Sequence, residues 1–157
     1  MIPYDVFQEI LSNVDKRLSE LEVRETTSIP SWKDVVPTVS QSGAVTLSSI
    51  EANFVHTGKL SLVFARLVIG STGMAGAPVQ VVLPLPVPSI KNSGSIRTHG
   101  SFSFLEATAI TYYVGSVISK GPNAIQFLTN TGALGEVPAF SIDVGDELSF
   151  TLVYETA

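Results

Sequence analysis

The side chains that could do chemistry are few and scattered. The two histidines, His56 and His99, lie far apart, and neither has a carboxylate in its own motif. Metal sites need clustered His, Asp or Glu ligands. The one acidic cluster is DVGDE, with Asp143, Asp146 and Glu147. It could bind calcium, but a turn with solvated carboxylates explains it equally well, so we expect no metal and no cofactor.

Motifs of known catalytic sites do not occur in the sequence. It has no nucleophile elbow, Walker loop, Rossmann glycine pattern or zincin motif. STGMAGAP is rich in glycine, but no helix follows it to hold a phosphate, so we expect a hairpin loop there. Glu51, Glu106 and Glu136 could meet in space as the paired carboxylates of a glycosidase, yet nothing in the sequence brings them together. We therefore expect a protein that is not an enzyme.

The composition narrows the class of protein further. Of 157 residues, 45% are hydrophobic and only 15% are charged, so the chain must bury apolar surface, partly against other copies. The net charge of −5 leaves no basic stripe for nucleic acid. No apolar run is long enough for a membrane span, and no basic leader begins the chain, so we expect neither a membrane partner nor Sec export.

The N-terminal residues predict a coiled-coil helix within 1–27. Apolar residues recur at spacings of three and four over about three heptads, which is an a/d seam. The seam residues are Tyr4, Phe7, Leu11, Val14, Leu18 and Leu21. Arg17 at a g position and Glu22 at the following e position suit an interchain salt bridge in a parallel coiled coil.

Two other positions bear on how this helix associates. Ile10 and Val6 widen the apolar face beyond the needs of a dimer, which favours a homotrimer. The alternatives are a helix that packs on its own domain and a helix that docks into a larger assembly. Self-association is favoured over intramolecular packing because the seam is narrow.

A proline-containing linker is predicted over 28–43. Pro30 and Pro37 break any helix there, and Trp32, the single tryptophan, lies in this junction. We expect Trp32 to cap the β body or to anchor the helix to it, with ligand stacking as the less favoured alternative.

From residue 44 to 157 the sequence predicts a mainly β domain. Eight runs rich in Val, Ile, Thr, Phe and Tyr are separated by Gly, Pro, Asn and Ser clusters. HTGK predicts a tight hairpin, with Gly58 at positive φ. Eight such strands favour an antiparallel β-sandwich, most simply a jelly roll.

The third run, LSLVFARLVI, is apolar on both faces, whereas one face of an antiparallel sheet usually meets water. Such a strand lies either under a covering loop or at a subunit interface. We favour an interface, formed by Val63, Ala65, Leu67 and Ile69.

Several motifs together resemble a family of proteins. They are WKDVVPT, FVHTGKL, LPLP, YYVG and the final DELSFTLVYETA, and they extend from about residue 30 to the end. This pattern resembles the β-sandwich domains of tailed-bacteriophage surface proteins, namely head fibres, capsid decoration proteins and the C-terminal parts of tail fibres.

The resemblance implies a structural protein on the virion surface that is assembled in the host cytoplasm. It would be a homotrimer held to other virion proteins, such as the major capsid protein, through its N-terminal helices. The β-sandwiches would project outward. The alternative is a receptor-binding or carbohydrate-binding tail-fibre module with a host surface glycan as partner, and Tyr112 and Tyr113 are possible contributors.

Overall fold

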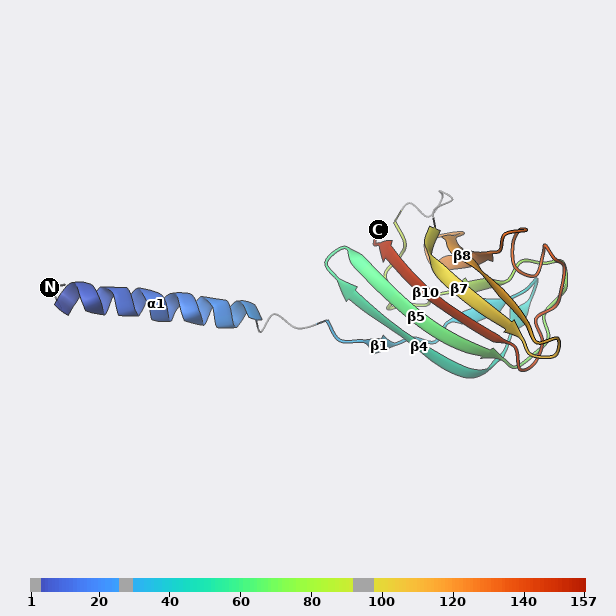
Figure 1. The fold of residues 1–157 in the computed structure, drawn as a ribbon, viewed down its shortest axis with the longest axis horizontal. Helices are drawn as coiled ribbons and strands as arrows, with labels where there is room; N and C mark the ends of the chain where they lie inside the picture. The colour runs from blue at the N-terminus through green and yellow to red at the C-terminus, as the bar shows by residue number, and fades with distance from the viewer. Residues whose placement is uncertain (1–3, 26–29, 92–97) are drawn as a thin grey trace. The chain divides into compact units, whose positions relative to one another are not determined.

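The structure is a computed structural model that describes residues 4–25, 30–91 and 98–157. The chain forms two compact units, Met1–Ser31 and Trp32–Ala157. The first unit holds the helix α1, Tyr4–Glu25, which lies within the predicted range (Figure 1). We call the second unit the β body.

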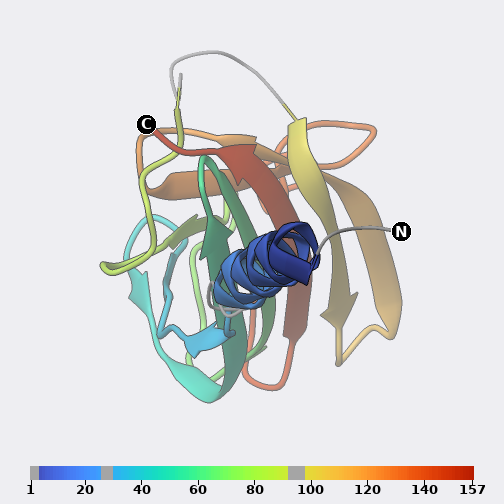
Figure 2. The same cartoon turned by 90° about the vertical axis from the view of Figure 1, so that its left-hand side faces the viewer.

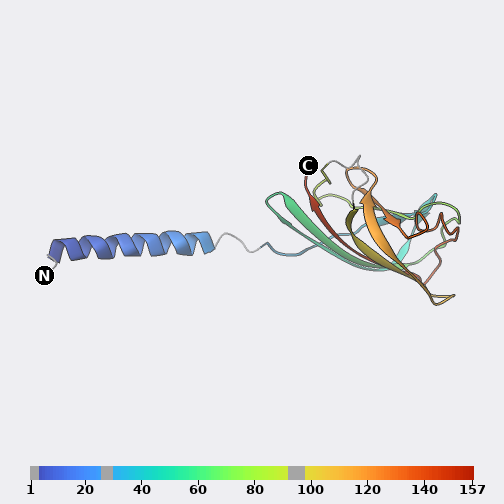
Figure 3. The same cartoon turned by 45° about the horizontal axis from the view of Figure 1, so that its top comes forward.

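The β body is one antiparallel sheet that curls into a half-barrel (Figure 1, Figure 3). In its described part the strands are β1 (Lys33–Asp34), β2 (Thr38–Ser40), β3 (Ala44–Val45), β4 (Leu47–Thr57), β5 (Leu60–Ile69), β6 (Gln80–Val82), β7 (Thr98–Glu106), β8 (Thr111–Ser119), β9 (Ala124–Leu128) and β10 (Glu147–Glu155). Their order is β1-β4-β5-β10-β7-β8-β9-β6-β2-β3. The mainly β, antiparallel class is therefore confirmed.

The centre of the sheet follows the predicted alternation. Figure 2 shows β10 (red) between β5 (green) and β7 (yellow). Phe150 and Leu152 of β10 are buried, whereas Thr151 between them points outward and is exposed. The β4–β5 hairpin turns at Gly58, whose φ of 58° is the positive value predicted for it. Alternation thus identified both the strand and the face that it buries.

The face of β5 that we expected at a subunit interface lies in the core of a single chain. Its residues are Val63, Ala65, Leu67 and Ile69, and all four are fully buried. They pair across the sheet with the apolar side of β10, as Val63 does with Leu152. The prediction is therefore corrected, because these side chains are not available to a second subunit.

The predicted linker contributes strands to the sheet. Lys33–Asp34 pairs with β4, and Thr38–Ser40 pairs with β3 and β6. Val39 is buried in the core between two exposed or half-buried neighbours. The linker over 28–43 is therefore corrected, because the β body already begins at Trp32.

The segment 71–78 was expected to form a hairpin loop, but it crosses between strands that are not neighbours. It connects β5 to β6, and four strands lie between these two in the sheet order. Gln41 holds this crossover: its amide nitrogen donates to the carbonyl oxygens of Ala77 (3.1 Å) and Phe140 (2.7 Å), and its amide oxygen accepts from the Ile142 nitrogen (2.9 Å). A buried glutamine with every bond made fixes these loops.

Two ends of the β body can be defined from the register. At the near end are the β4–β5 turn, the C-terminal residues of β10, and Trp32, where the chain enters the body. At the far end are the β7–β8 turn, residues 107–110, and the turn 143–146 before β10. These names are used below.

Candidate functional site

The apolar seam of α1 is uncovered wherever the structure describes its side chains. Leu11, Val14 and Leu18 are 42%, 47% and 52% exposed. Every other side chain described on α1, at residues 6, 8–10, 12, 13, 15–17, 19 and 20, is exposed as well. A row of apolar side chains along one face of a helix normally packs against something.

The remaining seam positions are less fully described. Tyr4, Phe7, Leu21 and Glu22 belong to the helical backbone of α1, but their side chains lie outside the described residues. Arg17 is exposed beside the seam, as a g position requires. Among the described residues, no helix has the length and apolar character that a membrane span needs.

The outer face of the sheet has a polar centre. Arg66 on β5 forms a salt bridge of 2.9 Å with Glu147 on β10, and Glu51 lies across from Arg66 on β4. The hydrogen bond that Arg66 donates to Glu147, followed by the negative charges of Glu147 and Glu51, raises the pKa of Arg66. Ser149 and Ser103 continue this row towards β8. The centre of the face is therefore suited to contact with water.

Other parts of the outer face are apolar instead. At the near end, Val55, Leu62 and Val153 are directly opposite one another on β4, β5 and β10. On β8, Val114 lies opposite Ser103 and Tyr112 lies opposite Leu105, and both β8 side chains point outward and are largely exposed. Sequence reasoning singled out Tyr112 but none of the near-end residues, because pairing across strands cannot be read from one strand at a time.

The far end presents apolar side chains on turns. Ile110 is 77% exposed and has a φ of 54°, a left-handed conformation that β-branched residues rarely adopt. Val144 and Tyr112 are exposed nearby, and we call these three residues the far-end cluster. Apolar residues held outward on a strained turn are typical of a recognition surface, not of a core.

Buried Asp146 fixes the two turns of the far end. Its carboxylate oxygens accept hydrogen bonds from the backbone nitrogens of Ala107 and Asp143, each at 2.8 Å. Tyr113 stacks on Phe140 with ring centroids 5.0 Å apart, and burial, helped by Glu106, raises the pKa of Tyr113. Tyr113 is thus a packing residue, whereas Tyr112 remains free to make contacts.

The acidic cluster therefore serves the fold. Both carboxylate oxygens of Asp146 accept hydrogen bonds from backbone nitrogens. Within the described residues, no group of three or more His, Asp or Glu side chains could hold a metal ion. His56 bonds to Ser61 (3.0 Å), and His99 packs edge-on against Tyr154. Glu51 and Glu106 are on β4 and β7, with two strands between them. The structure does not bring them together as a carboxylate pair.

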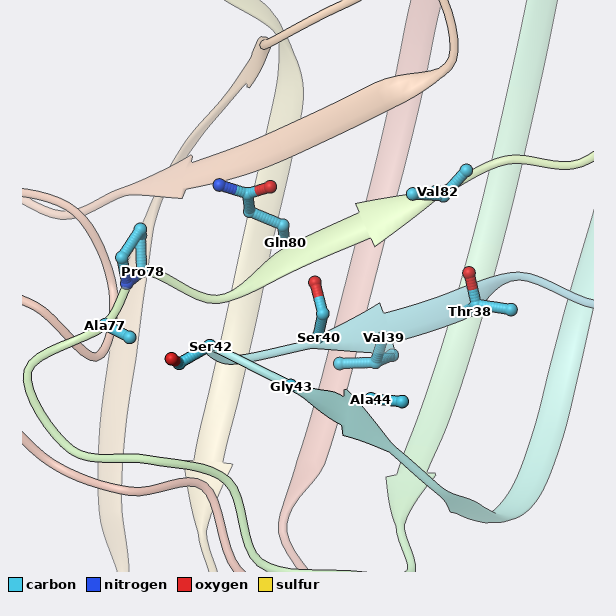
Figure 4. A pocket seen from close by; sticks show the side chains of 10 residues that line it. All are labelled: Thr38, Val39, Ser40, Ser42, Gly43, Ala44, Ala77, Pro78, Gln80 and Val82. Atoms are coloured by element: carbon cyan, nitrogen blue, oxygen red, sulfur yellow. The ribbon is translucent and has the colours of Figure 1, made fainter.

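A depression of about 770 Å³ lies on the sheet around β2, β3 and β6 (Figure 4). Its lining residues are small or uncharged: Thr38, Val39, Ser40, Ser42, Gly43, Ala44, Ala77, Pro78, Gln80 and Val82. None of them carries a charge or an aromatic ring. The depression therefore offers no general acid or base and no stacking surface for a sugar or a base.

Comparison with known proteins gives no match at any level. No family model matches the chain, no curated protein matches it, and no solved structure matches it. We therefore infer the function of the chain from its residues and their geometry.

Proposed function

We propose that this chain is a structural, non-enzymatic protein of a tailed-bacteriophage virion. It forms a homotrimeric surface fibre or capsid decoration. The N-terminal helical end attaches to other virion proteins, such as the major capsid protein, and three jelly-roll-like β bodies project outward. The protein is assembled in the host cytoplasm.

The observation that carries this proposal is the uncovered seam of α1 beside a β body that has its own core. α1 has 22 residues, and most of the stability of a helix in a protein comes from the packing of its apolar face. Among the described residues, the core of the body consists of residues from Val35 onward. Self-association through the a/d seam supplies the contacts that α1 lacks.

The virion assignment is supported by the resemblance of residues 30–157 to phage surface domains. It is also supported by the low charged fraction of 15%, which suits a chain that works inside an assembly. Purified particles of a phage that encodes the chain should contain it among their structural proteins by mass spectrometry. Its absence from such particles would contradict the assignment.

The oligomer is tested by a pair of double variants. Leu11→Asp with Leu18→Asp places charges in the seam, where they cannot be solvated in a trimer. Ser12→Asp with Ser19→Asp adds the same charges one position further along, outside the seam. We expect the first variant to be a monomer of 16.7 kDa and the second to keep the wild-type mass in analytical ultracentrifugation. Equal masses for both variants would contradict the coiled coil.

A second candidate function is a receptor-binding or carbohydrate-binding tail-fibre module. The far-end cluster favours it, because Ile110, Tyr112 and Val144 are exposed on and beside turns that Asp146 holds in place. Glycan-array binding that is lost in Tyr112→Ala and kept in Val82→Ala would support this module. No binding by the wild-type trimer would argue against it.

A further inference from the structure

One end of the outer face of the β body has an apolar row that is partly exposed in the described part of the chain: Val153 is exposed, and Val55 and Leu62 are half-buried. Val55, Leu62 and Val153 lie side by side across β4, β5 and β10. Leu60 and Phe64 flank this row on β5 and are 52% and 46% exposed, and Val153 is 54% exposed. We call these five residues the near-end patch.

Trp32 extends the near-end patch by one strand. In the register of β1 on β4, Lys33 pairs with Phe54, so one further residue sets Trp32 opposite Val55. Trp32 is 53% exposed in the single chain, so it does not cap the body as we expected from its position in the sequence. A large aromatic beside an aliphatic row is typical of the buried centre of an interface.

The same sheet shows what an outer face without a partner looks like. In its centre, beyond Phe64, the outward residues include Arg66 paired with Glu147, then Ser149 and Ser103, with Val68 opposite Glu147 and Val114 opposite Ser103. Strand geometry is continuous from this centre into the near-end patch. The change from polar to apolar side chains is therefore a property of the sequence at that end, not a requirement of the fold.

We propose that the near-end patch, with Trp32, is the interface through which the β body packs against a second copy of the same chain. This inference rests on the proposed trimer. Seven peptide units separate Glu25, the last residue of α1, from Trp32, so this segment reaches at most about 25 Å. The seam of a coiled coil brings helices to within about 10 Å. The tether therefore lets the region around Trp32 of one copy reach the same region of another.

Because the β bodies of a trimer are tethered to one another, a small patch is sufficient for their association. Bodies joined by short segments meet at an effective concentration of the order of millimolar, so a weak contact becomes populated. Charge is compatible with this occupant: each copy carries a net charge of −5, and the five residues of the near-end patch and Trp32 are uncharged, so they add no like-charge repulsion to the contact. Glu155 on β10, opposite Leu60, forms a salt bridge with Lys91 beside the patch.

The single tryptophan gives a direct readout in the full-length protein. We expect Trp32 in the wild-type trimer to emit at shorter wavelength and to be quenched by acrylamide several-fold less than in the Leu11→Asp, Leu18→Asp monomer. Val153→Lys should bring the quenching to the monomer level and shift dissociation on dilution to at least tenfold higher concentration. Val114→Lys is the matched control, because Val114 is also an outward-facing valine of this sheet, 67% exposed on β8.

Each other outcome would overturn the inference. A wild-type trimer with Trp32 as accessible as in the monomer leaves the proposed trimer standing and removes this interface. A wild-type monomer with a protected Trp32 means that the chain's own helix covers the patch, and the proposed trimer fails with it. Equal effects of Val153→Lys and Val114→Lys would mean that the contact is not confined to the near end.

Discussion

The two units of this chain bury their apolar side chains in opposite ways. The β body encloses a core that reaches from Val35 to Tyr154, and most of its members are less than 5% exposed. In α1, every described side chain is exposed, including leucine and valine at seam positions. The described core of the body is thus made of the body's own contacts, whereas the described side chains of the helix include an exposed apolar seam. Stability and assembly are thus assigned to different segments.

The largest expected effect on the body comes from Asp146→Ala. The change leaves the partly buried backbone nitrogens of Ala107 and Asp143 without their acceptor, and each unpaired donor costs about 1–3 kcal/mol. We expect the free energy of unfolding, measured in urea, to fall by about 4 kcal/mol. Asp143→Ala removes only a long contact to Ser141 and should cost less than about 1 kcal/mol. Similar losses for both variants would mean that Asp146 does not anchor the turns.

A smaller loss in the free energy of unfolding is expected from Gln41→Leu. The leucine fills the site but leaves the Ile142 nitrogen and the carbonyl oxygens of Ala77 and Phe140 unpaired. We expect a loss of about 2–3 kcal/mol in the unfolding of the body, with no change in native mass. Gln80→Leu, on the half-buried outer face, is the control and should be nearly neutral. A change of mass in Gln41→Leu would link the body to the oligomer and weaken the contrast between the two units.

Tyr154→Phe should cost about 1 kcal/mol, because the hydroxyl donates a hydrogen bond of 2.8 Å to the Pro88 carbonyl oxygen. Burial raises the pKa of Tyr154 above its ordinary value of 10.0. The neutral phenol is thus favoured in the fold, so its stabilisation is present below pH 10.0 and is lost as the pH rises through the raised pKa. Stability should therefore fall more steeply above pH 10.0 in the wild type than in Tyr154→Phe. Tyr112→Phe, exposed on β8, is the control for the loss of a tyrosine hydroxyl.

The smallest effect on the body is expected from removing residues 1–31. Because the core contains no residue of α1, the melting temperature of the body at low protein concentration should shift by no more than about 2 °C. Circular dichroism should lose its helical component and keep its strand component. A body that fails to fold without these residues would show that the helix packs on it, and the contrast drawn above would not hold.

Much of the sheet could be predicted from the sequence because alternation is clean in its central strands. In β10, Ser149 and Thr151 alternate with Leu148 and Phe150, so the sequence pattern predicts both the strand and its buried face. The short strands were missed. Lys33–Asp34 and Thr38–Ser40 have two and three residues, too few for a period. They lie between and just after Pro30 and Pro37, which suggest a linker.

We predicted that the buried face of β5 forms a subunit interface because both faces of this strand are apolar. Alternation says which residues share a face but not which face is inside. The decisive information is the pairing with β10, which aligns Ala65 with buried Phe150 and leaves Phe64 opposite exposed Thr151. The near-end patch depends on the same pairing, since it comes from three strands. Nothing in the sequence indicated the positive φ of Ile110, because β-branched residues normally avoid this backbone conformation.

The proposed homotrimer is tested most directly by the native mass of the full-length protein, measured by light scattering across a dilution series. We predict three times 16.7 kDa, held over the micromolar range, because the α1 seams and the near-end patches are covered by other copies. A mass of 16.7 kDa at every concentration would contradict it. The uncovered seam of α1 would then belong to a different partner.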